Sequence, residues 1–291
     1  MAVLQQVAGT KPEAMRQTFT LVLFVAFILG QAGAQAQQLC NFGARTAGMG
    51  YTSAAVADVW AVANNTAGIA TLTAPAVGVY AENRFGERAF TTVALQAVFP
   101  TQKYGTYGLS LSRFGDAFFS QQHAGLGVAH KLGQFSIGAK ADVWQVAVQE
   151  YGSRKTVALS VGVQGEVVPD LYFGAFAYNL NQAKLASFAD ERLPTVMKAG
   201  LSYRPTTRLL LAAETEKSID HDADFKAGAE YALLQQKFIL RSGFSTLTGS
   251  LSFGAGFKAR QLQVDYAFGS TTPIGNSHHV SVGYTFSRES Q

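Results

Sequence analysis

Residues 251–257 read Leu-Ser-Phe-Gly-Ala-Gly-Phe, and residues 262–268 read Leu-Gln-Val-Asp-Tyr-Ala-Phe. In the first stretch apolar side chains alternate with glycine or serine, and in the second large apolar side chains alternate with small or polar ones. Successive side chains of a β-strand point to opposite faces, so this alternation predicts two strands with one apolar face each. A period of two residues therefore indicates the fold class, and the rest of the chain repeats this period.

Twelve further segments of this kind follow one another from about residue 76 to the end of the chain. They lie at residues 77–81, 93–99, 107–112, 124–129, 135–140, 157–164, 171–179, 197–203, 209–214, 225–231, 238–244 and 280–286. The segment 171–179 is apolar on both faces, so its orientation is not predicted. Glycine, alanine and serine dominate the second face elsewhere, which is typical of a curved barrel interior. The sequence predicts an all-β, 14-stranded antiparallel barrel over residues 76–286.

The composition indicates where the apolar faces lie. Only 14% of the 291 residues are charged, against about 25% in soluble domains. A soluble sandwich would need a charged outer face on every strand, and this chain has too few charges for that. The apolar faces are therefore expected to meet lipid, where a sheet must close because every backbone group needs a partner. This predicts a barrel in the outer membrane of a Gram-negative bacterium.

The same counts exclude other classes of protein. The apolar content of 48% excludes disorder, and the single cysteine excludes a disulfide scaffold. A net charge of +4 without a block of Lys or Arg gives no sign of a nucleic-acid partner. Only one long apolar run is present, so a helical membrane bundle is excluded.

Loop lengths provide an independent test of a membrane barrel. If the first strand rises from the periplasm, connections from even to odd strands are periplasmic, and those at 168–170 and 204–207 are short. Connections on the other side include the longer segments 180–194, 216–223 and 269–278. Short periplasmic turns and longer external loops are typical of outer-membrane barrels.

The N-terminus carries the pattern of an export signal. The apolar run 19–29 follows Lys11 and Arg16 and precedes Ala34-Gln35-Ala36. A basic start, a short apolar stretch and an Ala-x-Ala site define a secretory signal peptide, here residues 1–36. Eleven apolar residues are too few for a spanning helix, which needs about 20. Cys40 follows a leucine where a lipobox has a small residue, so lipidation is disfavoured.

Before the barrel lies a distinctive block, Asn41-Phe-Gly-Ala-Arg-Thr-Ala-Gly-Met-Gly50, followed by residues 51–70 with Asn64-Asn65-Thr-Ala-Gly68. The block resembles the N-terminal motif of the FadL-like superfamily of outer-membrane barrels, and particularly its PorV/PorQ branch. The motif residues are Gly43, Arg45, Gly48, Met49, Gly50, Asp58, Asn64, Asn65 and Gly68. Val59 departs from the pattern, which has a second acid there, and Thr66 replaces a proline. Losing that proline frees φ, so a less rigid turn is expected.

The resemblance implies that residues 37–75 form a small plug inside the lumen. The alanine-rich stretch 53–63 predicts a short amphipathic helix. Asn64-Asn65 and Gly68 can end it, because Asn and Gly tolerate a left-handed backbone. Two roles stay open: a gate that moves to admit a ligand, or a fixed plug that fills the lumen and supports folding.

Charged residues on the inward faces balance in sign. They are Lys140, Lys198, Lys226 and Arg241 against Asp142, Glu214, Glu230 and Asp265. Isolated charges in a narrow lumen are costly, so pairing is expected. The network either supports the barrel and plug or provides a polar track for guidance. Outward aromatics predicted for the interfacial girdles are Trp144, Tyr203, Tyr231, Tyr266 and Tyr284.

The last strand reads Val282-Gly-Tyr284-Thr-Phe286. It looks like the C-terminal signal of bacterial outer-membrane barrels, which implies the barrel assembly machinery as a partner. The tail 287–291 is a departure, since that phenylalanine is more often terminal. The alternative is an ordinary closing strand.

Signals for catalysis are weak. His278-His279 could bind a metal, but no acidic or cysteine cluster accompanies the pair, and His221 is expected in a solvated loop. No nucleophile elbow, phosphate-binding loop or dinucleotide fingerprint occurs. We therefore predict a protein that is not an enzyme and has no cofactor or metal.

Two functional classes follow from the resemblance. The motif block favours a PorV/PorQ-type accessory of type IX secretion, with secretion-system components or cargo C-terminal domains as partners. The alternative is a FadL-type channel for a hydrophobic small-molecule ligand, which the short external loops weaken, because the longest is 180–194. The third hypothesis is a structural barrel without a transport role.

Overall fold

The structure is a computed structural model that describes residues 41–101, 103–184, 192–219, 221–272 and 274–287. The predicted signal peptide, Cys40 and most of the C-terminal tail lie outside these residues. Within the described part, no helix is both long enough and apolar enough to cross a bilayer.

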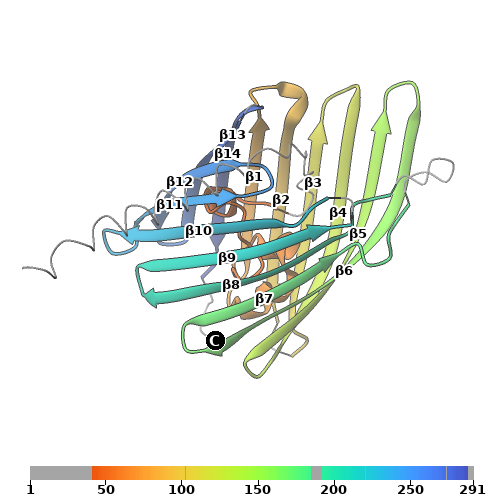
Figure 1. The fold of residues 1–291 in the computed structure, drawn as a ribbon. Helices are drawn as coiled ribbons and strands as arrows, with labels where there is room; N and C mark the ends of the chain where they lie inside the picture. Colours follow the sequence, from red (N-terminus) through yellow and green to blue (C-terminus); the bar gives the residue numbers. More distant parts are fainter. Residues whose placement is uncertain (1–40, 102, 185–191, 220, 273, 288–291) are drawn as a thin grey trace, which may run out of the picture.

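Fourteen antiparallel strands form one closed barrel, in which each strand pairs with its sequence neighbours and β1 pairs with β14 (Figure 1). The strands are β1 (Ala76–Arg84), β2 (Thr91–Pro100), β3 (Thr106–Gly115), β4 (Phe119–Leu132), β5 (Phe135–Val148), β6 (Gly152–Val168), β7 (Leu171–Tyr178), β8 (Val196–Thr206), β9 (Leu209–Ser218), β10 (Asp224–Leu233), β11 (Phe238–Ser245), β12 (Ser250–Ala259), β13 (Leu262–Thr271) and β14 (Gly275–Thr285). The predicted fold class is confirmed, and each of the fourteen segments coincides with a strand.

The two faces of the wall differ as the alternation predicts. In β5, Phe135 and Ile137 are about half exposed on the outside, while Ser136 and Lys140 are buried inside. The placement of Trp144 outside was wrong, because it is 4% exposed on the inner face. It shares the parity of Lys140 and Asp142, and a period of two residues puts all three on one side.

The strand without a predicted orientation, β7, turns Phe176 and Tyr178 inward, where both are buried. Its connection to β8 spans residues 179–195, whereas β6 and β7 are joined through 169–170 alone. The connections at 116–118 and 149–151 are also short. The contrast in loop length therefore rests mainly on the β7–β8 segment.

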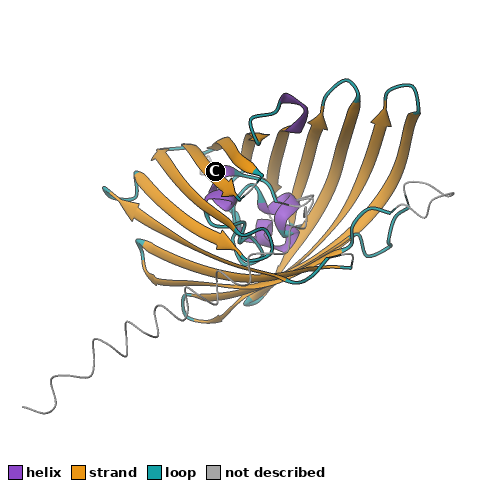
Figure 2. Ribbon diagram, turned by 45° about the horizontal axis from the view of Figure 1, so that its top comes forward, coloured by secondary structure: helices purple, strands orange, loops and turns teal. Residues whose placement is uncertain are grey.

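Among the described residues, three short helices lie inside the barrel: α2 (Ala44–Gly48), α3 (Ala61–Asn64) and the 3-10 helix η2 (Thr66–Thr71) (Figure 2). A further 3-10 helix, η3 (Arg88–Phe90), joins β1 to β2. The helix predicted over 53–63 is wrong, because only α3 forms and turns precede it. The expected left-handed end is wrong too, since Asn65 is extended at φ −157°. Its side chain instead accepts a hydrogen bond from the Ala67 N–H, which begins η2.

Candidate functional site

The plug rests on glycines of the inner wall, which we call the glycine belt. Where these glycines stand, a Cβ atom would press into plug atoms: at Gly138 it would lie 2.5 Å from the Ala67 nitrogen, and at Gly127 2.8 Å from the Thr66 methyl group. The belt comprises Gly78, Gly108, Gly127, Gly138, Gly162, Gly174, Gly228, Gly243 and Gly254. These residues belong to β1, β3, β4, β5, β6, β7, β10, β11 and β12, so the plug contacts the wall around most of its circumference.

The glycines of the plug motif have distinct roles. Gly43 and Gly50 have φ values of +99° and +65°, which side chains disfavour. Gly48 has an ordinary backbone but packs against Gly254 of β12, and Gly68 leaves room for Gln164. Met49 is fully buried between these contacts. The motif therefore shapes a chain that fits closely against the wall.

Arg45 connects the plug to the charges of the barrel. Its guanidinium donates two hydrogen bonds to Glu230 at 2.8 and 2.9 Å and one to Asp58 at 3.2 Å. Arg241 contacts Glu230 at 2.7 Å and Asp265 at 2.8 Å. Five charged groups thus form one network, in which a plug arginine shares a wall carboxylate with a wall arginine.

Asp58 links Arg45 to the turn before α3. Burial raises the pKa of its carboxyl above the ordinary value, and the Arg45 charge and the Trp60 N–H only partly oppose this. The Trp60 N–H donates to Asp58 at 2.9 Å. Asp58 therefore shapes the turn before α3 in addition to its contact with Arg45.

Backbone groups of the plug also bind wall and plug side chains. Glu214 of β9 accepts the N–H groups of Ser53 and Ala54 at 2.7 and 2.6 Å. Asn64 accepts the Phe42 N–H at 2.8 Å and donates to the Phe42 carbonyl at 2.9 Å. Thr66, which replaces the family's proline, is buried and donates to the Val62 carbonyl at 3.0 Å.

Asn65 reaches from the plug to the wall. Its amide donates to the Ala54 carbonyl at 2.6 Å and to the Val163 carbonyl of β6 at 3.1 Å. A wall strand and two parts of the plug therefore meet at one side chain.

A second ionic cluster lies around β8–β10. Lys226 contacts Glu216 at 2.6 Å, and Lys198 lies 3.6 Å from the same carboxylate. Lys198 also donates to the Asn41 side chain at 2.5 Å. Glu216 was not among the predicted lumen charges, because residues 216–223 were expected to form a loop, whereas β9 continues to Ser218 and keeps the inward parity of Glu214.

A third cluster surrounds Asp142. His123 Nε2 lies 2.5 Å from its Oδ1 atom, and the Lys140 ammonium lies 3.2 Å away. Ser112 Oγ is 3.3 Å from His123 Nδ1. The Trp144 ring packs on the imidazole at a centroid distance of 4.7 Å. Neither His123 nor Ser112 was among the sequence candidates, although both lie on inward positions of β4 and β3.

All eight predicted lumen charges lie on the inner face and are buried or half-buried. They separate into the three clusters above, with Glu214 binding plug backbone. Arg45 of the plug and Glu216 of β9 complete the clusters.

The histidine pair points in two directions. His279 lies inside, where it contacts Tyr80 at 2.9 Å and Tyr51 of the plug at 3.3 Å. His278 lies outside against Tyr266. Both belong to β14 rather than to a loop, so they cannot share a metal. Among the described residues no group of three or more His, Cys, Asp or Glu could hold a metal ion.

The C-terminal strand closes the barrel. Val282 pairs with Val79 of β1, and the Phe286 N–H donates to the Pro75 carbonyl at 2.8 Å. Tyr284 and Phe286 face outward and are 37% and 47% exposed. These residues thus complete the pairing of β14 with β1, the seam at which the two ends of the sheet meet.

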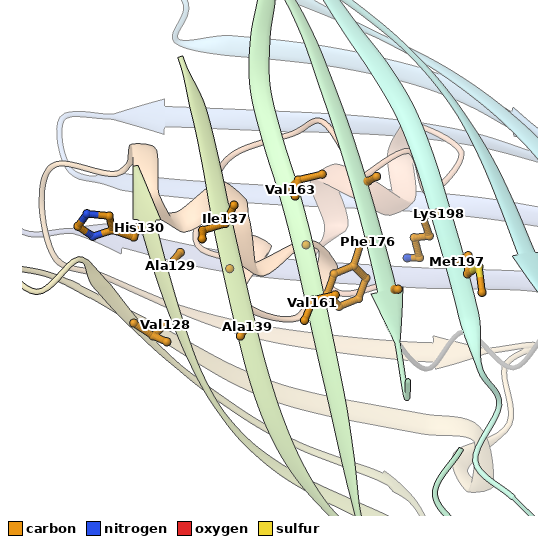
Figure 3. Close-up of a pocket in the computed structure, with 14 residues that line it drawn as sticks. Val128, Ala129, His130, Ile137, Ala139, Val161, Val163, Phe176, Met197 and Lys198 are labelled. Atoms are coloured by element: carbon orange, nitrogen blue, oxygen red, sulfur yellow. The ribbon is translucent and has the colours of Figure 1, made fainter. Parts of the chain in front are cut away.

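An apolar hollow of about 600 Å³ lies on the wall across β4–β8 (Figure 3). Its outward side chains include Val128, Ala139, Val161 and Met197. Gly138 and Gly162, which pair with each other, also line it. The plug packs against the same two glycines from the inner face of the wall. Only backbone therefore separates the hollow from the plug at these positions.

No family model and no curated protein matches the sequence. Solved structures do match. The toluene transporter TodX of P. putida has a TM-score of 0.65 at 13% identity, over 87% of this chain and 100% of that one. The CymD monoaromatic hydrocarbon channel gives 0.64 at 13%, over 88% and 100%. A FadL homologue of Pseudomonas aeruginosa gives 0.62 at 13%, over 84% and 98%. The chain therefore has the fold of FadL-type outer-membrane barrels.

Proposed function

We propose that this protein is an outer-membrane channel of a Gram-negative bacterium for hydrophobic small molecules. The observation that carries the proposal is the apolar hollow, which lies directly across the glycine belt from the plug. The fold shared with two hydrocarbon channels supports it. The sequence favoured a PorV/PorQ-type accessory and gave a FadL-type channel as the alternative. The comparisons with solved structures favour the channel.

The charges of the lumen fit an apolar rather than an ionic solute. In the part of the chain that the structure describes, the inward charges are engaged with one another or with plug backbone, so no ring of one sign lines an ion pathway there. A hydrophobic solute gains free energy from leaving water for an apolar surface. It enters at the external mouth, passes the plug and leaves through the wall at the hollow into the bilayer.

Uptake of toluene into liposomes tests this route. We expect the protein to accelerate entry over protein-free vesicles. Ala139→Leu with Ala175→Leu fills the hollow, and we expect uptake to slow by about tenfold, the scale on which small changes in an apolar pocket alter binding. Ala81→Leu, on the exposed face of β1 outside the hollow, is the matched control. Uptake equal to that of empty vesicles would disprove the function, and full uptake by the filled variant would disprove the route.

A second proposal rests on the motif at residues 43–70, which resembles the PorV/PorQ branch. In that case the barrel is an accessory of type IX secretion and binds cargo C-terminal domains or secretion-system components. Co-purification of these partners from membranes would support it. Unchanged secretion after deletion of the gene would contradict this second proposal.

A further inference from the structure

Three side chains near the end of the lumen at which β3 joins β4 form a continuous hydrogen-bonded chain. Ser112 of β3, His123 of β4 and Asp142 of β5 lie on adjacent strands and face inward. The Ser112 oxygen is 3.3 Å from His123 Nδ1, and His123 Nε2 is 2.5 Å from Asp142 Oδ1. His123 and Asp142 are buried, whereas Ser112 is half-buried. The hydroxyl is therefore the end of the chain that a solute can reach.

The carboxylate fixes the direction of the hydrogen bonds. An ionised Asp142 can only accept, so His123 Nε2 carries the proton and donates it. The lone pair of Nδ1 then faces the Ser112 hydroxyl, which donates to it. The Trp144 ring covers one face of the imidazole and helps to hold it in place. In this state the neutral histidine can accept the proton of an attacking serine, as in a serine–histidine–aspartate triad but with the roles of the two ring nitrogens exchanged.

Apolar rings lie beside Ser112 toward the mouth. Phe114, the next inward residue of β3, stacks on Phe90 and packs edge-on against Phe119, each with a centroid distance of 6.4 Å. Phe90 and Phe119 are 45% and 38% exposed, so a solute can reach this group of three rings. The Arg84 guanidinium lies 5.8 Å over the Phe114 ring. The guanidinium is bonded to the Glu82 carboxylate at 2.7 and 3.0 Å, so it holds the rings in place rather than binding a solute. An apolar acyl or aryl group fits the rings.

We propose that Ser112 is the nucleophile of a hydrolytic site for carboxylic esters with apolar acyl or aryl groups. The Ser112 oxygen bonds to the ester carbonyl carbon while its proton moves to His123 Nδ1. The carbon–oxygen bond to the alcohol breaks, and the alcohol leaves with that proton. Water, deprotonated by His123, then cleaves the acyl-serine to a carboxylic acid and restores the hydroxyl. Asp142 is a positioning residue, and the net reaction consumes one ester and one water.

A fluorophosphonate probe tests the nucleophile directly, because it phosphonylates activated serines. We expect the folded barrel to be labelled at Ser112, located by peptide mass spectrometry, and to hydrolyse p-nitrophenyl butyrate. Ser112→Ala abolishes both. Ser110→Ala is the matched control, because Ser110 is the inward serine two residues deeper on β3, buried and without a hydrogen-bond partner for its hydroxyl. It leaves both signals unchanged.

Variants of the other two residues separate a catalytic role from a structural one. His123→Gln and Asp142→Asn lower the labelling rate by about a hundredfold or more, the usual contribution of a positioned base. Folding of each variant is checked by the gel mobility of unboiled samples, so loss of labelling in a folded barrel supports the proposal. An unlabelled wild-type barrel, labelling that persists in Ser112→Ala, or an unchanged rate in His123→Gln overturns it. None of these results bears on toluene uptake, which tests the channel independently.

Discussion

At the scale of single residues, glycine is the determinant of how the plug fits. Five pairs of glycines stand opposite each other on neighbouring strands, and all but Gly200 and Gly283 belong to the glycine belt. Their missing side chains allow plug backbone to lie directly on wall backbone. The sequence predicted small inward residues, but it could not show which of them lie beneath the plug.

Substitution of one belt glycine tests this contact. At Gly174 of β7 a Cβ atom would overlap the Ala54 carbonyl of the plug. We expect Gly174→Ala to lower the free energy of unfolding by about 1–3 kcal/mol, the usual cost of overpacking. The control is Gly269→Ala on β13, whose Cβ would meet only His279 Nε2 at 3.9 Å. Urea titration of the barrel in detergent micelles measures both, and equal stabilities would contradict the packing.

At the scale of elements, the plug is held by side chains of several strands rather than by its own helices. α2 and α3 have five and four residues, far below the length at which an isolated helix is stable. Glu214 of β9, Glu230 of β10 and Asn65 provide contacts that the helices lack. The predicted helix over 53–63 failed for this reason, because contacts with the wall outweigh alanine's helix propensity.

Removing one anchor tests how firmly the plug closes the lumen. Glu214→Ala leaves the Ser53 and Ala54 N–H groups without their acceptor, and a hydrogen bond to a charged group contributes about 1.5–3 kcal/mol. We expect more frequent ion-conducting openings in planar bilayers than for the unaltered barrel. Glu166→Ala is the control, because Glu166 accepts the Asp170 N–H at the β6–β7 turn and does not contact the plug. Identical opening frequencies in the two variants would show that the plug does not depend on Glu214.

At the scale of the whole molecule, closure between β1 and β14 joins residues about two hundred positions apart. Ala76 pairs with Thr285 and Arg84 with Ser277 along one continuous seam. Without that seam each edge would expose unpaired backbone groups to lipid. Stability is therefore a property of the closed ring.

Gel mobility checks this property. We expect the unboiled barrel to migrate differently in detergent gels from the boiled chain. Val79→Pro removes a backbone N–H in the centre of β1, which pairs on both sides, and abolishes the folded band. Val79→Leu, at the same lipid-facing position, retains it. A folded band in the proline variant would argue against a continuous seam.

Features that depend on neighbouring residues can be predicted from the sequence, and features that depend on contacts between distant residues cannot. The fourteen strands and the inward charges could be predicted because a period of two residues is a local property that lipid and lumen impose on every strand. Glu216 was missed because residues 216–223 were predicted to form a loop, whereas β9 continues to Ser218. His123 was missed because only Lys, Arg, Asp and Glu were counted as lumen charges, although its parity places it inside. Trp144 was misplaced because its aromatic type was given more weight than its parity.

Patterns among neighbouring residues were enough to predict the number of strands, the face that meets lipid and the presence of a plug motif. The folded barrel was needed to show which glycines contact the plug, how the charges separate into clusters, and that Ser112, His123 and Asp142 meet. Such contacts join residues on different strands, and their distances depend on strand register and barrel closure, which no local pattern encodes.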